Sequence, residues 1–229
     1  MLNEDKEYLL SLGAIFLEEN IFYIPNFFDE DLLVAIKKEI DEEKEWQFTE
    51  KENGRNFTDM FVIKNPETNK KMQDIYEKFS QWPSFGKNFE NVENFDMQDV
   101  KWVKKRGTGA IPMMGPHWDG DPGVKYVDPK MMGTMRVPNR VKWATVIYLN
   151  DNFEGGELNY LHLGITFKPI AGALIGHKGD EPKYRHSVNE IVGDRYNLIF
   201  NFSYGDVNEP EEGEEALDFK GKANSDLLS

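Results

Sequence analysis

The second half of the chain is divided into many short apolar runs, and this pattern restricts the folds available to it. From residue 96 onward, runs of a few apolar residues alternate with turns rich in Gly, Pro and Asn. Many short strands separated by turn residues are typical of a sandwich, a barrel or a jelly roll. We expect strands at 98–105, 114–119, 141–149, 156–162, 164–168, 172–177, 186–192 and 195–203.

The N-terminal part has a different pattern, with two amphipathic segments that predict helices. Residues 14–25 favour a pair of short strands, and the following "NFFDEDLLVAIKKEIDEE" predicts a helix with Asp29 or Asp31 as its N-cap. A second helix is expected over 66–82, with Pro66 in its first turn. The apolar stripes of the two helices are Leu32, Leu33, Ile36 and Ile40 in the first, and Met72, Ile75, Tyr76 and Phe79 in the second.

The length and the distribution of apolar residues indicate one domain. We expect a single domain over 1–205, in which helices at about 28–82 pack on a β-core at about 96–204. The acidic segment 206–229 has few large apolar residues and is expected to be a disordered or surface tail. The Gly-, Pro- and Met-rich stretch 119–140 is expected to be a long loop, either a binding loop or a surface loop without function.

Charge and cysteine content exclude several classes of function. The net charge of −14 disfavours a partner that is bound mainly through its phosphates. The absence of cysteine excludes thiolate ligands, disulfides and a cysteine nucleophile, so a metal would be bound by nitrogen and oxygen. No signal peptide or membrane-spanning run is recognisable. We therefore expect a cytoplasmic protein without membrane or nucleic-acid partners.

The segment "GPHWDGD", residues 115–121, contains a candidate metal-binding pair. In an extended strand, side chains two residues apart point to the same face, so His117 and Asp119 would point together. The pair alone favours a polar surface patch, and only the residues further along the chain favour the metal-binding interpretation. Further along the chain lie His186 and, nine residues later, Arg195. Two histidines and a carboxylate are the ligand set of iron(II) sites that leave coordination positions open.

The stretch "HSVNEIVGDRYNLIFNF" predicts two strands joined by a turn at Gly193 and Asp194. If Val192 pairs with Arg195, then His186 pairs with Asn201, and His186 and Arg195 share a face. An inward-facing arginine in an apolar strand needs an anion, and its planar guanidinium suits a carboxylate.

The ordered segments "HWD", "YLNDNFEGGEL", "KPIAGALIGH" and "RHSVNEIVGDRYNLIFNF" resemble the iron(II)/2-oxoglutarate-dependent dioxygenases, specifically the prolyl 4-hydroxylase-like branch. The segment "IFYIPNFFDEDLLVAIKKEI" is similar to the strand and helix that begin the fold in that branch. The resemblance covers roughly residues 20–204. The two glycines of "FEGGEL" are interpreted as structural, at a turn with no room for a Cβ.

The resemblance implies a mainly β fold with flanking helices around a double-stranded β-helix, the jelly roll of cupin-like proteins. It implies iron(II) on His117, Asp119 and His186, with no catalytic side chain beyond the metal centre. Arg195 and Tyr148 would bind the distal carboxylate of 2-oxoglutarate. The implied reaction uses dioxygen, with ascorbate as a possible reductant, to hydroxylate a prolyl or similar residue of a peptide or protein with release of succinate and CO2.

Two other functions are compatible with the same scaffold. One is a catalytically inert jelly-roll binding or structural module. The other is a nucleobase demethylase, but that branch carries a second arginine six residues after the first, where this chain has Asn201. Trp143 and Asn201 are candidates for lining the pocket, although packing in the core is the favoured interpretation of both. His162 and His177 are not expected to be ligands, although His177 is a candidate for facing the substrate.

Overall fold

The computed structural model describes residues 1–43, 48–52, 55–79, 81–82, 102–106, 114–119 and 141–203, some strands by their backbone alone. The helices in these ranges are α1 (Asn3–Ser11), α2 (Glu30–Glu42), α3 (Pro66–Phe79) and the short 3-10 helix η4 (Pro182–Tyr184). The strands are β1 (Ile15–Glu18), β2 (Ile21–Ile24), β3 (Phe48–Glu52), β4 (Arg55–Val62), β5 (Trp102–Arg106), β6 (Met114–His117), β7 (Val141–Tyr148), β8 (Glu154–Gly155), β9 (Leu158–Tyr160), β10 (Ile165–Phe167), β11 (Leu174–Lys178), β12 (His186–Val188), β13 (Ile191–Val192) and β14 (Arg195–Ser203).

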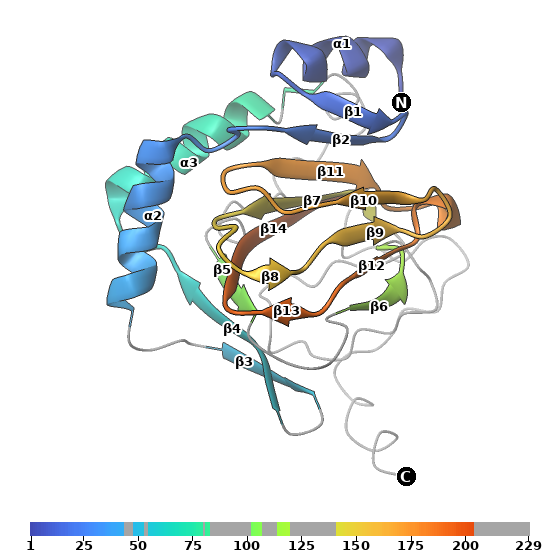
Figure 1. Cartoon of the computed structure of the whole chain (residues 1–229). Coiled ribbons are helices and arrows are strands. Elements are labelled where there is room, and N and C mark those ends of the chain that lie inside the picture. The colour runs from blue at the N-terminus through green and yellow to red at the C-terminus, as the bar shows by residue number, and fades with distance from the viewer. Residues whose placement is uncertain are drawn as a thin grey trace, which may run out of the picture.

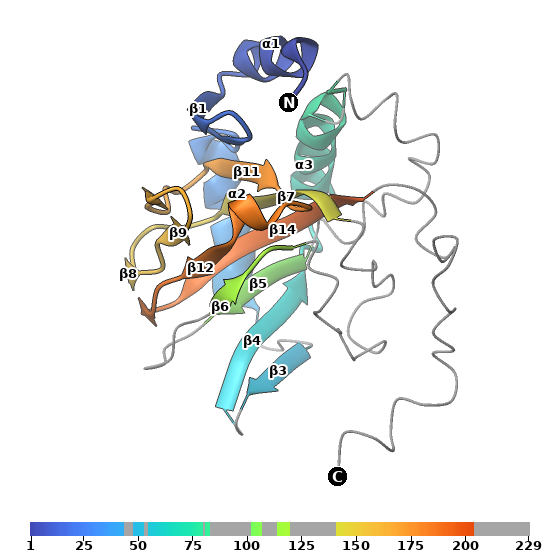
Figure 2. The same ribbon diagram turned by 90° about the vertical axis from the view of Figure 1, so that its right-hand side faces the viewer.

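Within these ranges the strands form two main antiparallel sheets (Figure 1). The larger sheet has the order β1-β2-β11-β7-β14-β5-β4-β3, and the smaller has the order β10-β9-β12-β6. Strands β8 and β13 pair with each other in a separate two-stranded ribbon. In Figure 2, α3 lies on the side of the larger sheet opposite to β9 and β12. The predicted class, mainly β with flanking helices, is confirmed.

Alternating side chains of the larger sheet separate two hydrophobic cores. Ile147 and Leu174 belong to the core under the helices, together with Leu32, Ile36 and Phe79. Their immediate neighbours in sequence, Tyr148 and Ile175, belong to a second core that also contains Leu158 and Val188 of the smaller sheet. This division follows from the two-residue period of a strand. The second core fills the space between the two sheets, and the candidate site lies at its polar edge.

Both predicted helices are present, and their apolar stripes face the larger sheet. Leu32, Ile36 and Ile40 of α2 are buried, as are Met72, Tyr76 and Phe79 of α3. α3 ends at Phe79, three residues earlier than expected, and the buried Trp82 packs against its end. At the start of α3, the Asn65 side chain accepts hydrogen bonds from the backbone N–H of Glu67 and Thr68.

The N-cap of α2 gives a testable difference between two neighbouring carboxylates. The side chain of Asp29 accepts a hydrogen bond from the Leu32 N–H at 2.8 Å, whereas Asp31 is an exposed residue of the first turn. We expect Asp29→Ala to lower the free energy of unfolding by about 1 kcal/mol, because it leaves a helix-end donor unpaired. Asp31→Ala removes the same charge and should cost about 0.3 kcal/mol. Urea denaturation of both variants measures the difference, and equal losses would contradict the assignment of Asp29 as the cap.

The predicted hairpin at Gly193 and Asp194 is wrong. β12 pairs with β6 and β9 of the smaller sheet, and β13 pairs with β8, whereas β14 pairs with β5 and β7 of the larger sheet. His186 therefore lies opposite His117, and Asn201 lies opposite Ala144. A Gly-Asp pair signals a turn but does not select the partner of each strand. Gly193, with φ +105°, instead turns the chain from the ribbon into the larger sheet.

The "FEGGEL" turn supports the structural interpretation of its glycines. Gly155 has a φ of +73°, and a Cβ there would lie 1.9 Å from the backbone oxygen of Glu190. Any side chain would therefore push apart the β8–β13 ribbon, in which Gly155 pairs with Ile191.

Some segments were not predicted, and others lie outside the described residues. The sequence analysis did not assign α1 or the β3–β4 hairpin, although Asn53-Gly54 between two alternating stretches is a strong hairpin signal. The loop beyond Asp119 and the tail 206–229 are outside the described ranges, so both remain expectations. Among the described residues, no helix is long and apolar enough to cross a membrane.

Candidate metal centre

Two of the three predicted ligands lie on neighbouring strands of the smaller sheet. His117 ends β6, His186 begins β12, and the antiparallel register places the two residues directly opposite each other. Directly opposite residues of a sheet project to the same face. Their rings lie 4.5 Å apart between centroids, so the sheet itself brings together two imidazoles that are far apart in sequence.

Backbone carbonyls orient both rings and select the tautomer of the neutral ring. His117 Nδ1 lies 2.8 Å from the Gly115 oxygen, and His186 Nδ1 lies 3.0 Å from the Tyr184 oxygen. A carbonyl oxygen only accepts hydrogen bonds, so each Nδ1 carries a proton, and in the neutral ring Nε2 keeps its lone pair. The buried Nε2 of His117 has no hydrogen-bond partner among the described residues. Each ring thus presents a bare nitrogen, as a metal ligand requires.

Asp119 completes the group from a turn that follows β6. The strand ends at His117, so the geometry assumed for a continuous strand over 114–119 does not hold. The carboxylate nevertheless reaches His186, with 3.8 Å between Oδ2 and Nε2. One donor atom from each of His117, Asp119 and His186 lies within 4.8 Å of the others. The structure brings the three predicted ligand residues together.

A fourth polar side chain contacts the carboxylate from the larger sheet. His177 of β11 lies with its Nε2 at 2.8 Å from Asp119 Oδ2 and its Nδ1 at 2.9 Å from the hydroxyl of Tyr160. Its side chain is 2% exposed. His177 was expected to lie outside the ligand set and to be a candidate for facing the substrate. It is outside the three-residue group, but it is buried against that group.

Burial and neighbouring charges hold these groups in defined protonation states. Burial raises the pKa of Asp119, but the nearby His186, His177 and His117 outweigh it, and the pKa stays well below its usual value. Burial, reinforced by His177, lowers the pKa of His186 to about 3. Burial also raises the pKa of the Tyr160 hydroxyl far above its usual value, so it remains a donor. At neutral pH Asp119 is therefore an anionic carboxylate and His186 a neutral ring, and both suit a cation.

A second polar group lies on β14 and β7, at the inner face of the larger sheet. Arg195 is 3% exposed, and its guanidinium lies 5.9 Å from the ring centroid of the buried Tyr148. Burial lowers the pKa of Arg195, yet an arginine stays charged at neutral pH. Its Nε has no hydrogen-bond partner among the described residues. A buried cation without an anion is unfavourable, so this position favours an anionic ligand.

Asn197, two residues along β14, extends this polar group and was missed by the sequence analysis. It is fully buried and lies opposite Tyr148 in the register, so both face the inner core with Arg195. Neither its amide nitrogen nor its amide oxygen has a partner among the described residues. Buried polar atoms are rarely left unpaired in native proteins, so Asn197 also indicates a polar ligand here.

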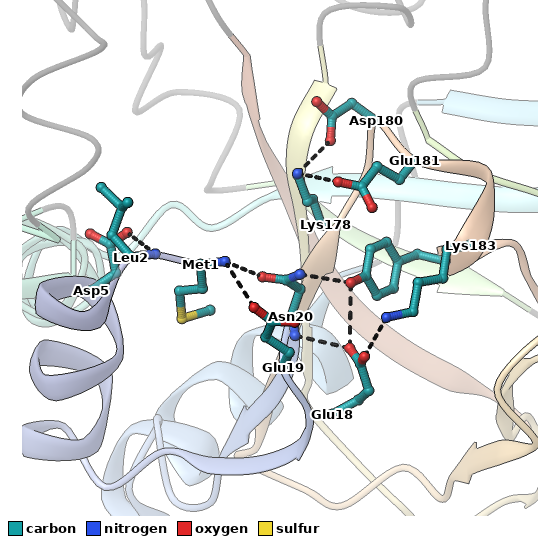
Figure 3. A network of polar contacts seen from close by, with 11 residues as sticks. Met1, Leu2, Asp5, Glu18, Glu19, Asn20, Lys178, Asp180, Glu181 and Lys183 are labelled. Carbon is teal, nitrogen blue, oxygen red and sulfur yellow. Dashed lines mark hydrogen bonds and ion pairs between the residues drawn. The ribbon is translucent and has the colours of Figure 1, made fainter.

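Two further contacts hold the strands that carry the histidines. Arg185 donates a hydrogen bond from Nη2 to the Pro116 oxygen at 3.1 Å, which joins β12 to β6 beside His117. Tyr184, whose backbone oxygen orients His186, accepts a hydrogen bond from the Asn20 side chain at 2.7 Å. The Lys183 ammonium lies 5.3 Å from the ring centroid of this tyrosine and pairs with Glu18, and Figure 3 shows Lys183, Glu18 and Asn20 close together. The turn before His186 is thereby fixed to the β1–β2 hairpin.

The remaining candidates lie away from the group. Trp143 packs against Phe22 and Trp82 in the core under the helices, which is the packing role favoured from the sequence and not the alternative role of lining the pocket. His162 is exposed and outside the metal-binding group, as expected. Asn201 lies in β14, but its side chain is outside the described part.

We compared the sequence and the fold of this chain with those of known proteins. No family model and no curated protein sequence matches the chain. A Pseudomonas putida prolyl-4-hydroxylase has a TM-score of 0.53 at 17% identity, over 90% of this chain and all of that one (100%). The viral collagen prolyl hydroxylase of Paramecium Bursaria Chlorella virus-1, in its 2OG complex, has a TM-score of 0.52 at 14% identity, over 82% and 97%. NgTET1 in complex with 5mC DNA has a TM-score of 0.53 at 12% identity, over 83% and 75%.

The fold of this chain is therefore that of the 2-oxoglutarate/iron(II) oxygenases, with a jelly-roll core as in the prolyl hydroxylases. The resemblance drawn from the sequence motifs is confirmed at the level of the fold. Identities of 12% to 17% show a shared scaffold and leave the reaction to be argued from the site.

Proposed function

We propose that this protein is an iron(II)- and 2-oxoglutarate-dependent oxygenase that hydroxylates a prolyl or similar residue of a peptide or protein. The observation that carries the proposal is the preformed group of His117, Asp119 and His186, with donor atoms within 4.8 Å and ring nitrogens left bare by their tautomers. A group of two imidazoles and one carboxylate suits iron(II), and the chain contains no thiolate to favour another metal.

The residues around the group also fit 2-oxoglutarate. Arg195 would bind the distal carboxylate through its planar guanidinium, with Tyr148 beside it. Asn197 offers an amide with both polar atoms unpaired among the described residues. When bound, iron and 2-oxoglutarate supply oxidative decarboxylation to succinate and CO2 and the insertion of one oxygen atom from dioxygen into a C–H bond.

The protein's own contribution is to bind, orient and exclude water. The sheet pairing of β6 with β12 fixes the two imidazoles, and the core between the sheets, including Leu158, Ile175 and Val188, lies beside them. In such an apolar surrounding the attraction between Arg195 and a carboxylate is stronger than in water. Ascorbate as a reductant and a cytoplasmic location remain predictions from the sequence.

A peptide or protein substrate is favoured over nucleic acid by charge. The chain carries a net charge of −14, and phosphate binding requires basic side chains. The position six residues after Arg195 is Asn201, where the resemblance to demethylases would require arginine. The likeness to NgTET1 supports the shared fold and does not outweigh these two observations.

The experiment is a turnover assay with substrate mixtures. Wild-type protein with iron(II), 2-oxoglutarate and air is incubated with proline-containing peptide mixtures and, separately, with methylated single-stranded oligonucleotides. We expect succinate to form in step with a peptide product that is heavier by one oxygen atom, and not with His186→Ala. Demethylation of the oligonucleotides would favour the rival oxygenase. Absence of succinate with every substrate, in protein that binds no iron, would favour an inert jelly-roll module.

A further inference from the structure

Asp119 is the one member of the metal-binding group that no sheet pairing holds in place. His117 and His186 belong to paired strands and have carbonyl partners for their Nδ1 atoms. Asp119 lies in a turn beyond β6, and its side chain is 20% exposed. A free carboxylate rotates readily about its last torsion, which is broad. Some other contact must fix its orientation if the group is to be preformed.

His177 supplies this contact, and Tyr160 fixes the state of His177. The Asp119 carboxylate only accepts hydrogen bonds, so His177 Nε2 carries a proton, and in the neutral ring Nδ1 accepts a hydrogen bond from the Tyr160 hydroxyl at 2.9 Å. That Nε2–H points at Asp119 Oδ2, 2.8 Å away. The three residues come from β9 of the smaller sheet, β11 of the larger sheet and the turn after β6. The chain of hydrogen bonds thus ties the turn to both sheets.

We propose that His177 is a positioning residue that orients Asp119 for metal binding, with the Tyr160 hydroxyl supporting, as a donor to Nδ1, the tautomer in which His177 donates to the carboxylate. The proposal rests on the proposed function and adds to it a residue outside the ligand set. Hydrogen-bond partners of ligating side chains typically change metal affinity by about 10- to 100-fold when they are removed. His177 does not itself bind the metal, because its Nε2 proton is directed at Asp119.

Three variants test the role through iron(II) binding without oxygen, measured by calorimetry and by the visible spectrum after addition of 2-oxoglutarate. His177→Phe keeps a ring but removes the donor, and we expect iron(II) affinity to fall by about 10- to 100-fold. His177→Gln keeps an N–H donor and should retain affinity within a few-fold of wild type. Tyr160→Phe keeps the buried ring, and we expect an intermediate loss because the proton of His177 is free to move to Nδ1. His162→Phe, at an exposed position, is the matched control and should change nothing.

The outcomes separate the two proposals. If wild-type protein binds no iron(II), both the proposed function and the role of His177 are contradicted. If wild type binds iron(II) and His177→Phe binds equally well, only the role of His177 is overturned. Loss of binding in His177→Gln as complete as in His186→Ala would make His177 a ligand, which also contradicts positioning. If His177→Phe does not fold, the iron(II) affinity of Tyr160→Phe tests the role of His177 instead. An unchanged affinity overturns the proposal, and an intermediate loss supports it.

Discussion

Replacing Arg195 with methionine is expected to abolish tight binding of 2-oxoglutarate without harming the apo protein. Truncating one partner of a buried charge pair costs about 2–5 kcal/mol, or about 30-fold to several thousand-fold in affinity. Methionine is of similar length and fills the apolar surroundings beside Tyr148. Anaerobic titration of the iron(II)-loaded variant with 2-oxoglutarate measures the loss. Arg195→Lys keeps the charge but not the planar pair of donors. Its affinity for 2-oxoglutarate should lie between those of the wild type and Arg195→Met.

Replacing Arg195 with methionine should leave the stability of the apo protein unchanged or raise it. In the apo protein the Arg195 guanidinium is buried, and its Nε has no partner among the described residues. Arg195 forms no ion pair with a carboxylate in the described part of the chain, and removing a buried charge without such a partner relieves a desolvation penalty. Thermal unfolding without ligands tests this expectation. A large loss of stability together with unchanged affinity for 2-oxoglutarate would make Arg195 a structural residue and would contradict the assigned role.

The second large effect is the loss of iron(II) in His186→Ala. His186 is buried, its Nε2 is bare, and it lies opposite His117 in the sheet. Removing one of three ligands should eliminate measurable binding, so iron(II) should stabilise the wild type against heat and leave the variant unaffected. His162→Ala is the matched control, because it makes the same chemical change at an exposed histidine.

Two results would contradict this expectation. One is iron(II) stabilisation of His186→Ala equal to that of the wild type, which would remove His186 from the ligand set. The other is an equal loss in His162→Ala, which would show that the effect of iron(II) does not depend on this site. Circular dichroism of both variants checks that the fold is retained.

Helices α2 and α3, most strands and the candidate ligand residues could be predicted because their signals are local. Asp29 precedes an apolar stripe at helical spacing, and His117 and Asp119 stand two residues apart in a recognisable motif. Family resemblance then joined His186 and Arg195 to that motif. Each of these inferences depends on residues that are close in sequence or on an ordered set of motifs.

The inferences that failed depend on strand pairing, which a local pattern does not specify. His186 was paired with Asn201 across a presumed hairpin, but the chain changes sheets at Gly193. His177 is 58 residues from Asp119, and only the packing of the two sheets brings them within hydrogen-bond distance. Asn197 reads as an ordinary polar residue in an apolar strand until its register with Tyr148 is known. The available signal was a polar residue two positions from Arg195, which places both side chains on one face of a strand.

The visible spectrum of the wild-type protein with iron(II) and 2-oxoglutarate, in the absence of oxygen, tests the central claim most directly. It requires no substrate, because the absorption arises from charge transfer between the metal and the chelating cosubstrate. The account predicts a band that appears only when both are added and that is absent in His186→Ala. A folded wild-type protein that shows no band would contradict the oxygenase function and would leave a jelly-roll module without this chemistry.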